Sequence, residues 1–480
     1  MHREPLDAVR SYRARHAWRV LAEFRELLAL SNVTGDLPAL RRNAAAVADL
    51  LTARGARMEV VEHAGAAPLV TGRLGTGDRP TLGVYVHYDG QPVGTGWHSP
   101  PFTPTLRDGD REVPFPGPGD AVHDDWRLYS RAAADDKAPL IALATALDGL
   151  RDAGVEPAVD LVFCLDGEEE SGSPHLAGYL DALRGRLRAD AWLVFDGPVH
   201  HSGAPQVVLG VRGYCGFELT VHGPTRELHS GHFGNWVPNP ALTLAHLLAT
   251  FKDEHGNVTV QGFYDDTAPP GDADRAALAA LPPVEDVLLE RVGVAGPEIP
   301  DSRLADRLML PSFNIRGLRA GDVGDAARNV VPATASASVD IRLAAGDRPE
   351  RMLRRVREHL TAHGCLVLDR DPTDAERRAH HRIVRLDAAL GYPAVRTPAG
   401  TPIVRHLAEL ATEAAGEEAL TVPGLGGSLP LHALSRLDSP LVILPIANAD
   451  NNQHAADENL LLRNLWYGVD LFTLLLTRRP

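Results

Sequence analysis

Residues 161–174 read LVFCLDGEEESGSP, and they indicate the architecture of the large part of the chain. The first five residues are all apolar, which is typical of a short strand covered on both faces of its sheet. After Asp166 and Gly167 come three glutamates, close to the point where this strand would end. Two other short apolar segments, 81–86 and 192–195, are likewise followed by a histidine or an aspartate. Open α/β sheets bind ligands at the carboxyl ends of their strands, so these positions are candidates for chemistry.

The spacing of apolar residues changes along the chain and divides it into two domains. Helical apolar repeats at 16–30, 38–54 and 136–151 accompany the strands, and strands that alternate with helices predict a mostly parallel sheet. After about residue 212, segments 215–222 and 333–343 alternate apolar and polar residues, as half-buried strands do. The first pattern returns near residue 395. We therefore predict an α/β fold: one large domain from 1–212 and 395–480, interrupted by a smaller α+β domain at 213–394.

Composition narrows the classes of partner and compartment. The 480 residues include 48 Lys and Arg against 63 Asp and Glu, a formal net charge of −15. Such a surface repels phosphate backbones and anionic lipids, so we expect neither a nucleic acid nor a membrane as partner. The three cysteines, Cys164, Cys215 and Cys365, are too few for a disulfide framework. The N-terminal segment has no apolar stretch of signal-peptide length, so we expect a cytoplasmic protein.

Acidic and histidine side chains occur at several of the predicted strand ends and helix starts. Taken alone, each is more often structural: a satisfied histidine, a helix cap or a solvated acidic turn. Together they make a mixed nitrogen and oxygen set that suits zinc, manganese or cobalt. Carboxylates gathered without a cation would repel one another, and a bound dication removes that conflict. The sequence therefore predicts that a divalent metal binds among these places, which are His87–Asp89, Asp135–Lys137, Glu168–Ser173, Asp196 and His454.

With these residues in view, the chain resembles the dinuclear zinc exopeptidases and deacylases. This family includes carnosinase-type cytosolic dipeptidases, acetylornithine and succinyl-diaminopimelate deacylases, and glutamate carboxypeptidase. The resemblance covers nearly the whole chain, in the right order, and is nearest to the cytosolic dipeptidases. The motifs that carry it are VYVHYDGQPV (84–93), WHSPPFTP (97–104), DDK (135–137), DGEEESGSP (166–174), LHSGHFG (228–234), NVVPATASASVDIRL (329–343), GGSLP (426–430) and NADNNQHAADEN (448–459).

The resemblance implies roles for the residues of the large domain, which would be catalytic. Two divalent metal ions are expected, with zinc favoured over manganese and cobalt. Asp135 would bridge the two ions, and the other ligands would be His87, Glu170, Asp196 and His454. Glu169 would be the general base on a water that bridges the ions, and Asp89 would orient His87. The Asp135–Asp136 peptide is expected to be cis.

The resemblance also implies roles for the inserted domain, as a lid through which a homodimer forms. His229 would reach the active site of the partner subunit as an oxyanion donor. Arg342 would bind the terminal carboxylate of the substrate in a bidentate manner. Asn329 would line the pocket, and Gly427 and Ser428 of the large domain would offer backbone donors near the substrate.

One motif departs from the family pattern. Relatives usually carry glycine at the three positions that are Ser130, Ala132 and Ala138 in this chain. A side chain there is penalised wherever the backbone needs a positive φ. The local backbone next to Asp135, or the entrance to the site, is therefore expected to differ from that of relatives.

Three functions remain open from the sequence. The first is a metal-dependent hydrolase of dipeptides or related small peptides. The second keeps the metals but acts on an N-acyl amino acid or a pathway-specific amide, which also carries a free carboxylate. The third is a non-catalytic homologue that binds a peptide. An intact Glu169 argues against the third, because a binding protein does not need a general base. Other hydrolase signatures are missing: the chain has no Gly-x-Ser-x-Gly elbow and no His-Glu-x-x-His motif.

Overall fold

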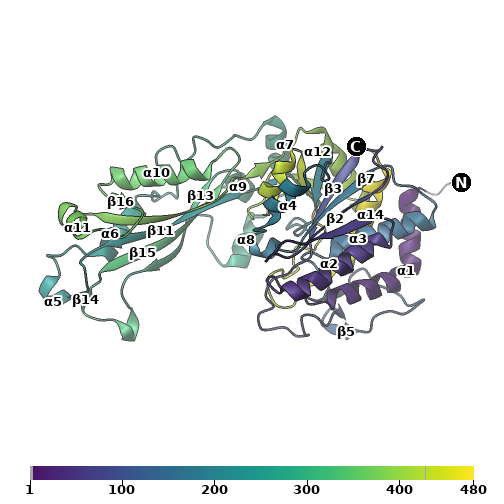
Figure 1. Cartoon of the computed structure of the whole chain (residues 1–480), viewed down its shortest axis with the longest axis horizontal. Helices are drawn as coiled ribbons and strands as arrows, with labels where there is room; N and C mark the ends of the chain where they lie inside the picture. Colours follow the sequence, from purple (N-terminus) through teal and green to yellow (C-terminus); the bar gives the residue numbers. More distant parts are fainter. Residues whose placement is uncertain (1–3, 428) are drawn as a thin grey trace.

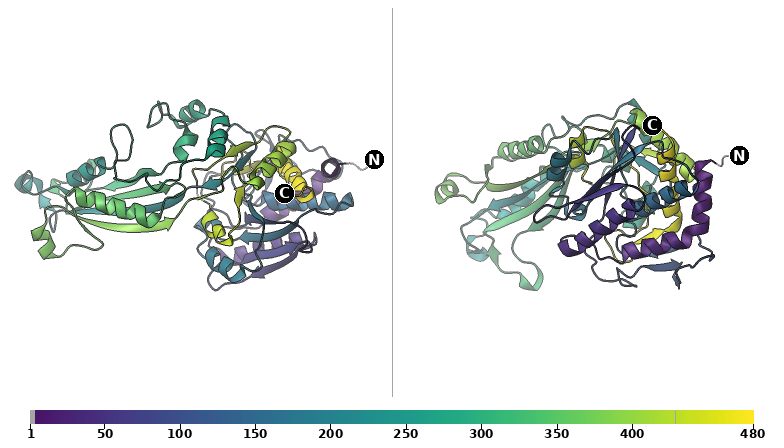
Figure 2. Two further views of the ribbon diagram at one scale, coloured as in Figure 1. Left: turned by 90° about the horizontal axis from the view of Figure 1, so that it is seen from above. Right: turned by 45° about the vertical axis from the view of Figure 1, so that its right-hand side comes forward.

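The computed structural model describes residues 4–427 and 429–480, and it has a large part and an elongated smaller part (Figures 1 and 2). An eight-stranded sheet in the order β1-β2-β7-β3-β8-β20-β9-β19 forms the centre of the large part. Neighbours β7, β3, β8 and β20 run parallel, whereas β1 and β2 are antiparallel additions at one edge. The strands span Arg57–Val61 (β1), Leu69–Leu74 (β2), Thr81–His87 (β3), Asp160–Asp166 (β7), Ala191–Val194 (β8), Gln206–Val208 (β9), Leu420–Val422 (β19) and Leu441–Ile443 (β20).

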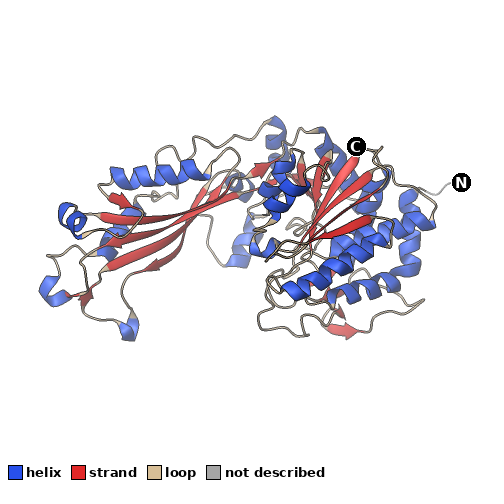
Figure 3. Cartoon of the chain, viewed as in Figure 1, coloured by secondary structure: helices blue, strands red, loops and turns tan. Residues whose placement is uncertain are grey.

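Helices cover both faces of this sheet, as the continuous apolar strands predicted. On β3, Val84 and Val86 pack into one buried cluster, and Tyr85 between them packs into another. The first cluster joins the sheet to α1 (Pro5–Leu28), α2 (Leu37–Thr52), α3 (Ala138–Asp152), α12 (Pro402–Ala415) and α14 (Leu462–Thr477). The second joins it to α4 (Leu176–Leu183) and α13 (Leu431–Leu434). Figure 3 shows the blue helices on the two sides of the red sheet.

Gly83 allows the central strands to approach closely. A Cβ atom on this residue would lie 2.3–2.6 Å from ring atoms of Trp192 on the neighbouring strand β8. The Trp192 ring therefore crosses β3 directly over the glycine and is completely buried. This packing fixes the position of β3, the strand that ends in His87.

The smaller part is built on a five-stranded sheet in the order β13-β15-β11-β17-β16. Its strands span Gly213–His222 (β11), Ser312–Arg319 (β13), Thr334–Leu343 (β15), Leu366–Leu368 (β16) and Ile383–Tyr392 (β17). Helices α6 (Pro240–Ala249) and α10 (Pro349–Ala362) share a buried apolar cluster with this sheet. The predicted segments 215–222 and 333–343 correspond to β11 and β15. The sequence did not indicate β13 or β17, because much of each strand is exposed and β13 contains a bulge between Ile315 and Gly317.

The chain enters and leaves the smaller part through adjacent short strands. β10 (Gly210–Val211) pairs with β18 (Val395–Arg396), next to the predicted boundaries at 212 and 395. The division into 1–212, 213–394 and 395–480 itself stays a prediction. Three helices of the predicted insertion lie between the two sheets in Figure 1: α7 (Asp272–Ala280), α8 (Glu285–Val292) and α9 (Leu304–Leu308). Leu278 and Leu281 from this region pack into the second buried cluster of the large sheet.

The remaining elements are short. Strands β4 (Thr105–Asp108), β5 (Arg111–Val113), β6 (Arg127–Tyr129) and β21 (Asn459–Leu461) form a four-stranded antiparallel sheet. In the smaller part, β12 (Leu228–His229) pairs with β14 (Val330–Val331), next to α5 (Ser230–Phe233). Helix α11 (Asp374–Ala379) precedes β17. None of the described helices combines the length and the apolar character needed to cross a membrane.

Candidate metal centre

The carboxyl ends of neighbouring parallel strands bring the predicted ligands to one place. His87 is the last residue of β3, and Asp196 follows β8 by two residues. Glu169 and Glu170 lie in a short 3-10 turn after β7. Asp135 precedes helix α3, and His454 lies in the loop after β20. Because β3 lies between β7 and β8, these side chains meet at one edge of the sheet.

Five of these six side chains, all except Glu169, form two groups that share Asp135. In the first group, the Nε2 atom of His87 lies 2.8 Å from Oδ1 of Asp135 and 3.8 Å from Oδ2 of Asp196. In the second group, Nε2 of His454 lies 3.1 Å from the other oxygen of Asp135 and 3.2 Å from Oε2 of Glu170. Within each group the potential ligand atoms all lie within 4.8 Å of one another. Asp135 therefore offers one oxygen to each group, as a bridging ligand does.

These donor atoms suit divalent cations. A cation would offset the negative charge of the carboxylates and would give the buried Asp196 carboxylate a partner. The Oδ2 atom of Asp196 is buried and has no hydrogen-bond partner. Burial raises the pKa of Asp196 to about 7, and nearby carboxylates add to this effect. Burial would also raise the pKa of Asp135, but hydrogen bonds from His454 and His87 hold it below its usual value. Imidazole and carboxylate donors in this arrangement suit zinc and related ions.

Asp89 supports both the histidine and the glutamate turn. Its side chain is completely buried, and Oδ1 lies 3.4 Å from Nδ1 of His87. The same carboxylate accepts the backbone N–H groups of Glu169 at 3.1 Å and of Glu170 at 3.2 Å. The Asp89 carboxylate therefore contacts the predicted ligand His87 and the backbone of Glu169 and Glu170. It can hold the two predicted ligands and the candidate base Glu169 in fixed relative positions.

Glu169 faces a large cavity beside these ligands. The cavity has a volume of about 650 Å³ and is lined by Glu169, Asp135, Asp196 and His454, among others. Burial raises the pKa of the Glu169 carboxyl well above its usual value, His87 opposes this shift, and Asp196 adds to it. A carboxylate with a raised pKa is a stronger base than an ordinary one, which suits proton transfer near neutral pH.

Comparison with known proteins agrees with this geometry. The model of peptidase family M20/M25/M40 matches residues 83–478, which is most of the chain. The chain belongs to this peptidase family. The Cys-Gly metallodipeptidase dug1 of Schizosaccharomyces pombe is 27% identical over 414 residues, covering 84% of this chain and 81% of that protein. The Beta-Ala-His dipeptidase of Rattus norvegicus is 25% identical over 394 residues, covering 75% and 74%.

A solved structure confirms the fold of this M20/M25/M40 member. The M20 family metallo-carboxypeptidase Sso-CP2 from Sulfolobus solfataricus superimposes with a TM-score of 0.77 at 24% sequence identity. The alignment covers 95% of this chain and 98% of that chain. The predicted α/β architecture, with a large sheet and a smaller second part, is therefore confirmed. The predicted membership of the metallopeptidase family is confirmed by the family model over residues 83–478.

Other predicted site residues of this family member lie apart from the ligand cluster. His229 is the N-cap of α5, which lies beside β14 at the far left of Figure 1, distant from the large sheet. Asn329 is exposed, and its carbonyl accepts the N–H of Ser230. Arg342 lies 3.4 Å from Asp340 and over the Tyr214 ring. Gly427 lines the cavity, and Ser428 lies outside the described residues.

Sequence reasoning missed Glu458, which supports the backbone of the bridging ligand. Its buried Oε1 atom accepts the N–H groups of Ala134 at 3.0 Å and Asp135 at 3.1 Å. The other oxygen accepts a hydrogen bond of 2.6 Å from the equally buried Arg131. A glutamate four residues after His454 was visible in the sequence. No local pattern, however, indicates a contact across more than 300 residues.

The departure from the family glycine pattern has a structural consequence. Ala132, one of the positions where the resemblance implies glycine, has a φ of 63°, in the left-handed region. This conformation costs an L-residue roughly 1–2 kcal/mol. The backbone therefore keeps a conformation that suits glycine, despite the alanine. The Asp135–Asp136 peptide is cis, as the resemblance implied.

Proposed function

We propose that this chain is a metal-dependent peptidase that hydrolyses the amide bond of dipeptides. The observation that carries this proposal is the pair of ligand groups that share Asp135, beside a cavity that Glu169 also lines. Relatives of the same family are named Cys-Gly and Beta-Ala-His dipeptidases, which supports a dipeptide as substrate.

In this proposal, His87, Asp135 and Asp196 would hold one divalent ion, and Asp135, Glu170 and His454 would hold a second. Zinc is the expected ion, and manganese or cobalt would suit the same donors. When bound, such ions polarise the scissile carbonyl and make a coordinated water more acidic.

The residues of the chain supply the proton transfers. Glu169 accepts a proton from the attacking water and then gives it to the leaving amine nitrogen. The raised pKa of its carboxyl suits both steps, because the group must first accept and then release the proton. Asp89 keeps Glu169 in place through the backbone hydrogen bond of 3.1 Å.

The remaining substrate contacts would come from the inserted domain and from Gly427 of the large domain. Arg342 would bind the substrate carboxylate, with Asn329 lining the pocket and Gly427 as a backbone donor. The distance of His229 from the large domain favours a homodimer in which each His229 serves the site of the partner subunit. The three cysteines are buried and unpaired, which supports a reducing compartment such as the cytoplasm.

A second candidate function uses the same centre. An N-acyl amino acid deacylase or another amidase needs the same ions, base and carboxylate contact. The substrate distinguishes the two functions, so a panel of both compound types is required. A protein that only binds peptides has no use for Glu169 in this position.

The experiment measures hydrolysis of dipeptides and N-acyl amino acids by the purified protein, with and without a chelator. We expect chelator-sensitive cleavage of dipeptides, and we expect Glu169→Gln to retain bound metal while losing at least about 100-fold in kcat. Preferred cleavage of N-acyl amino acids would favour the deacylase instead. Peptide binding that is indifferent to Glu169→Gln, without any cleavage, would overturn the enzymatic proposal.

A further inference from the structure

The cavity beside the metal ligands has one extensive apolar wall. The inserted segment contributes Leu278, Leu281, Leu304, Ala305 and Leu308 to it. The large domain contributes further apolar side chains to the same cavity, namely Val199, Val211, Val422, Leu425 and Leu429. A volume of about 650 Å³ lies within the range of about 300–1,000 Å³ typical of small-molecule sites. The cavity next to the predicted metal ligands is therefore lined largely by aliphatic side chains.

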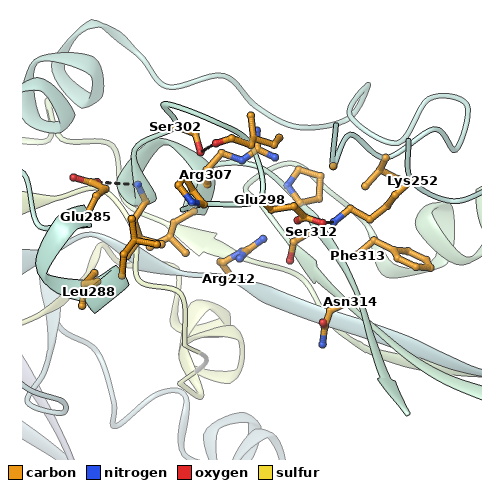
Figure 4. Close-up of a pocket in the computed structure, with 18 of the residues that line it drawn as sticks. Arg212, Lys252, Glu285, Leu288, Glu298, Ser302, Arg307, Ser312, Phe313 and Asn314 are labelled. Carbon is orange, nitrogen blue, oxygen red and sulfur yellow. Dashed lines mark hydrogen bonds and ion pairs between the residues drawn. The ribbon is translucent and has the colours of Figure 1, made fainter. Parts of the chain in front are cut away.

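Two segments of the inserted domain form this wall, one with Leu278 and Leu281 and the other with Leu304, Ala305 and Leu308. Hydrogen bonds connect the two segments to their neighbours. The Arg303 guanidinium donates to the carbonyl groups of Leu278 at 3.1 Å and Leu281 at 2.8 Å. The Glu285 carboxylate accepts the backbone N–H of Leu304 at 3.0 Å. Figure 4 shows Glu285 at the edge of a neighbouring cavity of about 450 Å³. This cavity shares Glu285, Leu304 and Leu308 with the first. The wall is thus an ordered partition between two cavities.

The wall also contacts the large domain. A Cβ atom on Gly426 would lie 3.0 Å from Cδ2 of Leu308, so Leu308 packs closely over the loop that includes Gly427. Leu278 and Leu281 are each only 7% exposed and belong to a buried cluster with residues of the large sheet. The apolar surface is therefore fixed in position beside the metal ligands.

The charges in the cavity do not favour an acidic or basic substrate side chain. Apart from the predicted ligands and Glu169, the polar side chains among the described lining residues are His200, His201, Gln206, Glu285, Arg303 and Gln453. Of these, only Glu285 and Arg303 carry a permanent charge, and both are engaged in holding the wall. A charged substrate side chain would lose its hydration here without gaining an available opposite charge.

From this arrangement we propose that the wall is a subsite for a bulky apolar group next to the scissile amide. The preferred substrates are dipeptides with a leucine- or phenylalanine-sized side chain, and Ala305 and Leu308 determine this preference. The inference rests on the proposed amide hydrolase function and adds the substrate class to it. An apolar acyl group on an amino acid has the same chemistry, so the test must separate these two sources.

The test compares kcat/KM values of the metal-loaded full-length protein. The dipeptides are Gly-Gly, Leu-Gly, Gly-Leu, Phe-Gly, Gly-Phe and Glu-Gly, and N-octanoylglycine represents an apolar acyl group. Burial of one such side chain corresponds to about 10- to 100-fold in kcat/KM, so we expect the best apolar dipeptide to exceed Gly-Gly by that factor. We expect Glu-Gly to be no better than Gly-Gly. A preference for N-octanoylglycine over every dipeptide would assign the subsite to acyl groups and overturn the dipeptide form of the proposal.

Two variants locate the effect at the wall. Ala305→Trp fills the cavity and Leu308→Asn makes the wall polar, and each should lower the ratio of apolar to Gly-Gly kcat/KM by about tenfold or more. Both side chains are half-buried, so at least one variant should fold, and thermal unfolding checks this. Ala276→Trp, on the exposed face of α7, is the matched control and should keep the ratio.

The two levels of the proposal fail in different ways. If Gly-Gly and the apolar dipeptides are cleaved equally, or if folded wall variants keep the wild-type ratio, the apolar subsite is wrong while the hydrolase stands. If the metal-loaded protein cleaves no compound in the panel, the proposed function itself fails.

Discussion

Asp89 shows how one buried side chain can organise a reaction centre. It contacts His87 and fixes the backbone of both Glu169 and Glu170. Removal of such a partner typically costs 10- to 100-fold in metal affinity. We therefore expect Asp89→Ala to weaken metal binding by about 10- to 100-fold, as measured by competition with a chromogenic chelator. An unchanged affinity would show that the Asp89 carboxylate does not orient the ligands, because the variant keeps the Asp89 carbonyl that lies 3.1 Å from Nδ1 of His87. Asp108→Ala, at an exposed site, is the control.

The buried pair of Arg131 and Glu458 permits a second prediction at the level of residues. The two side chains are 1% and 0% exposed, so removing one partner leaves an uncompensated buried charge. We expect Arg131→Ala to lower the free energy of unfolding by about 3–5 kcal/mol, as measured by urea denaturation. Arg111→Ala breaks the exposed pair with Asp108 and should cost less than about 1 kcal/mol. A similar effect of the two variants would contradict the importance of the buried pair.

At the level of elements, strand β3 links packing to the metal centre. Because the Trp192 ring occupies the space where a Cβ atom of Gly83 would be, Gly83→Ala must displace the ring or the strand. We expect a loss of about 1–3 kcal/mol in stability and weaker metal binding, because His87 ends the same strand. Gly178→Ala, where nothing lies within 4 Å of the added atom, is the control. Unaltered stability of Gly83→Ala would mean that the strands adjust freely.

His359 in helix α10 should make the stability of the protein depend on pH, independently of the candidate metal centre. His359 packs against Phe251 and bonds Thr250 at 2.8 Å, and burial lowers its pKa to about 4, with a further contribution from His363. In the unfolded chain, His359 takes up a proton near pH 6.5. In the folded chain, His359 does so only near pH 4. Stability that is present above pH 6.5 is therefore lost as the pH falls toward 4.

The measurement for this helix compares unfolding at pH 7 and pH 5. His359 should contribute about 1–2 kcal/mol to the loss of stability at pH 5, and this share should vanish in His359→Gln. The exposed His255→Gln should retain the wild-type dependence. If His359→Gln also retains it, the histidine is not buried as a neutral group.

The sequence reveals local features of the elements better than long-range contacts. The strands that end in His87 and Asp166 were predictable because an apolar run stops at a charged residue. Strand β17 was not predictable, since residues 387–391 are exposed and lack the alternation of a half-buried strand. Glu458 and the wall residue Leu308 act through contacts with distant segments, and only the folded chain brings those segments together.

For the whole molecule, the proposed role of His229 in the active site implies a second subunit. This residue lies at the end of the smaller part that is farthest from the large sheet (Figure 1). We expect light scattering to give about 103 kDa, twice the mass of 51.6 kDa for one chain. We also expect His229→Ala to reduce kcat by about 100-fold or more while leaving metal affinity unchanged. A fully active monomer would contradict the proposed role of His229.

We propose that two ions held through Asp135 would enable this protein to hydrolyse dipeptides. The most direct measurement is a titration of the metal-free protein with Zn²⁺, in which cleavage of Leu-Gly is followed at each addition. We expect no activity without metal and a rise to a plateau at two equivalents per chain. Full activity of the metal-free protein, or no cleavage at any metal concentration, would contradict this proposal.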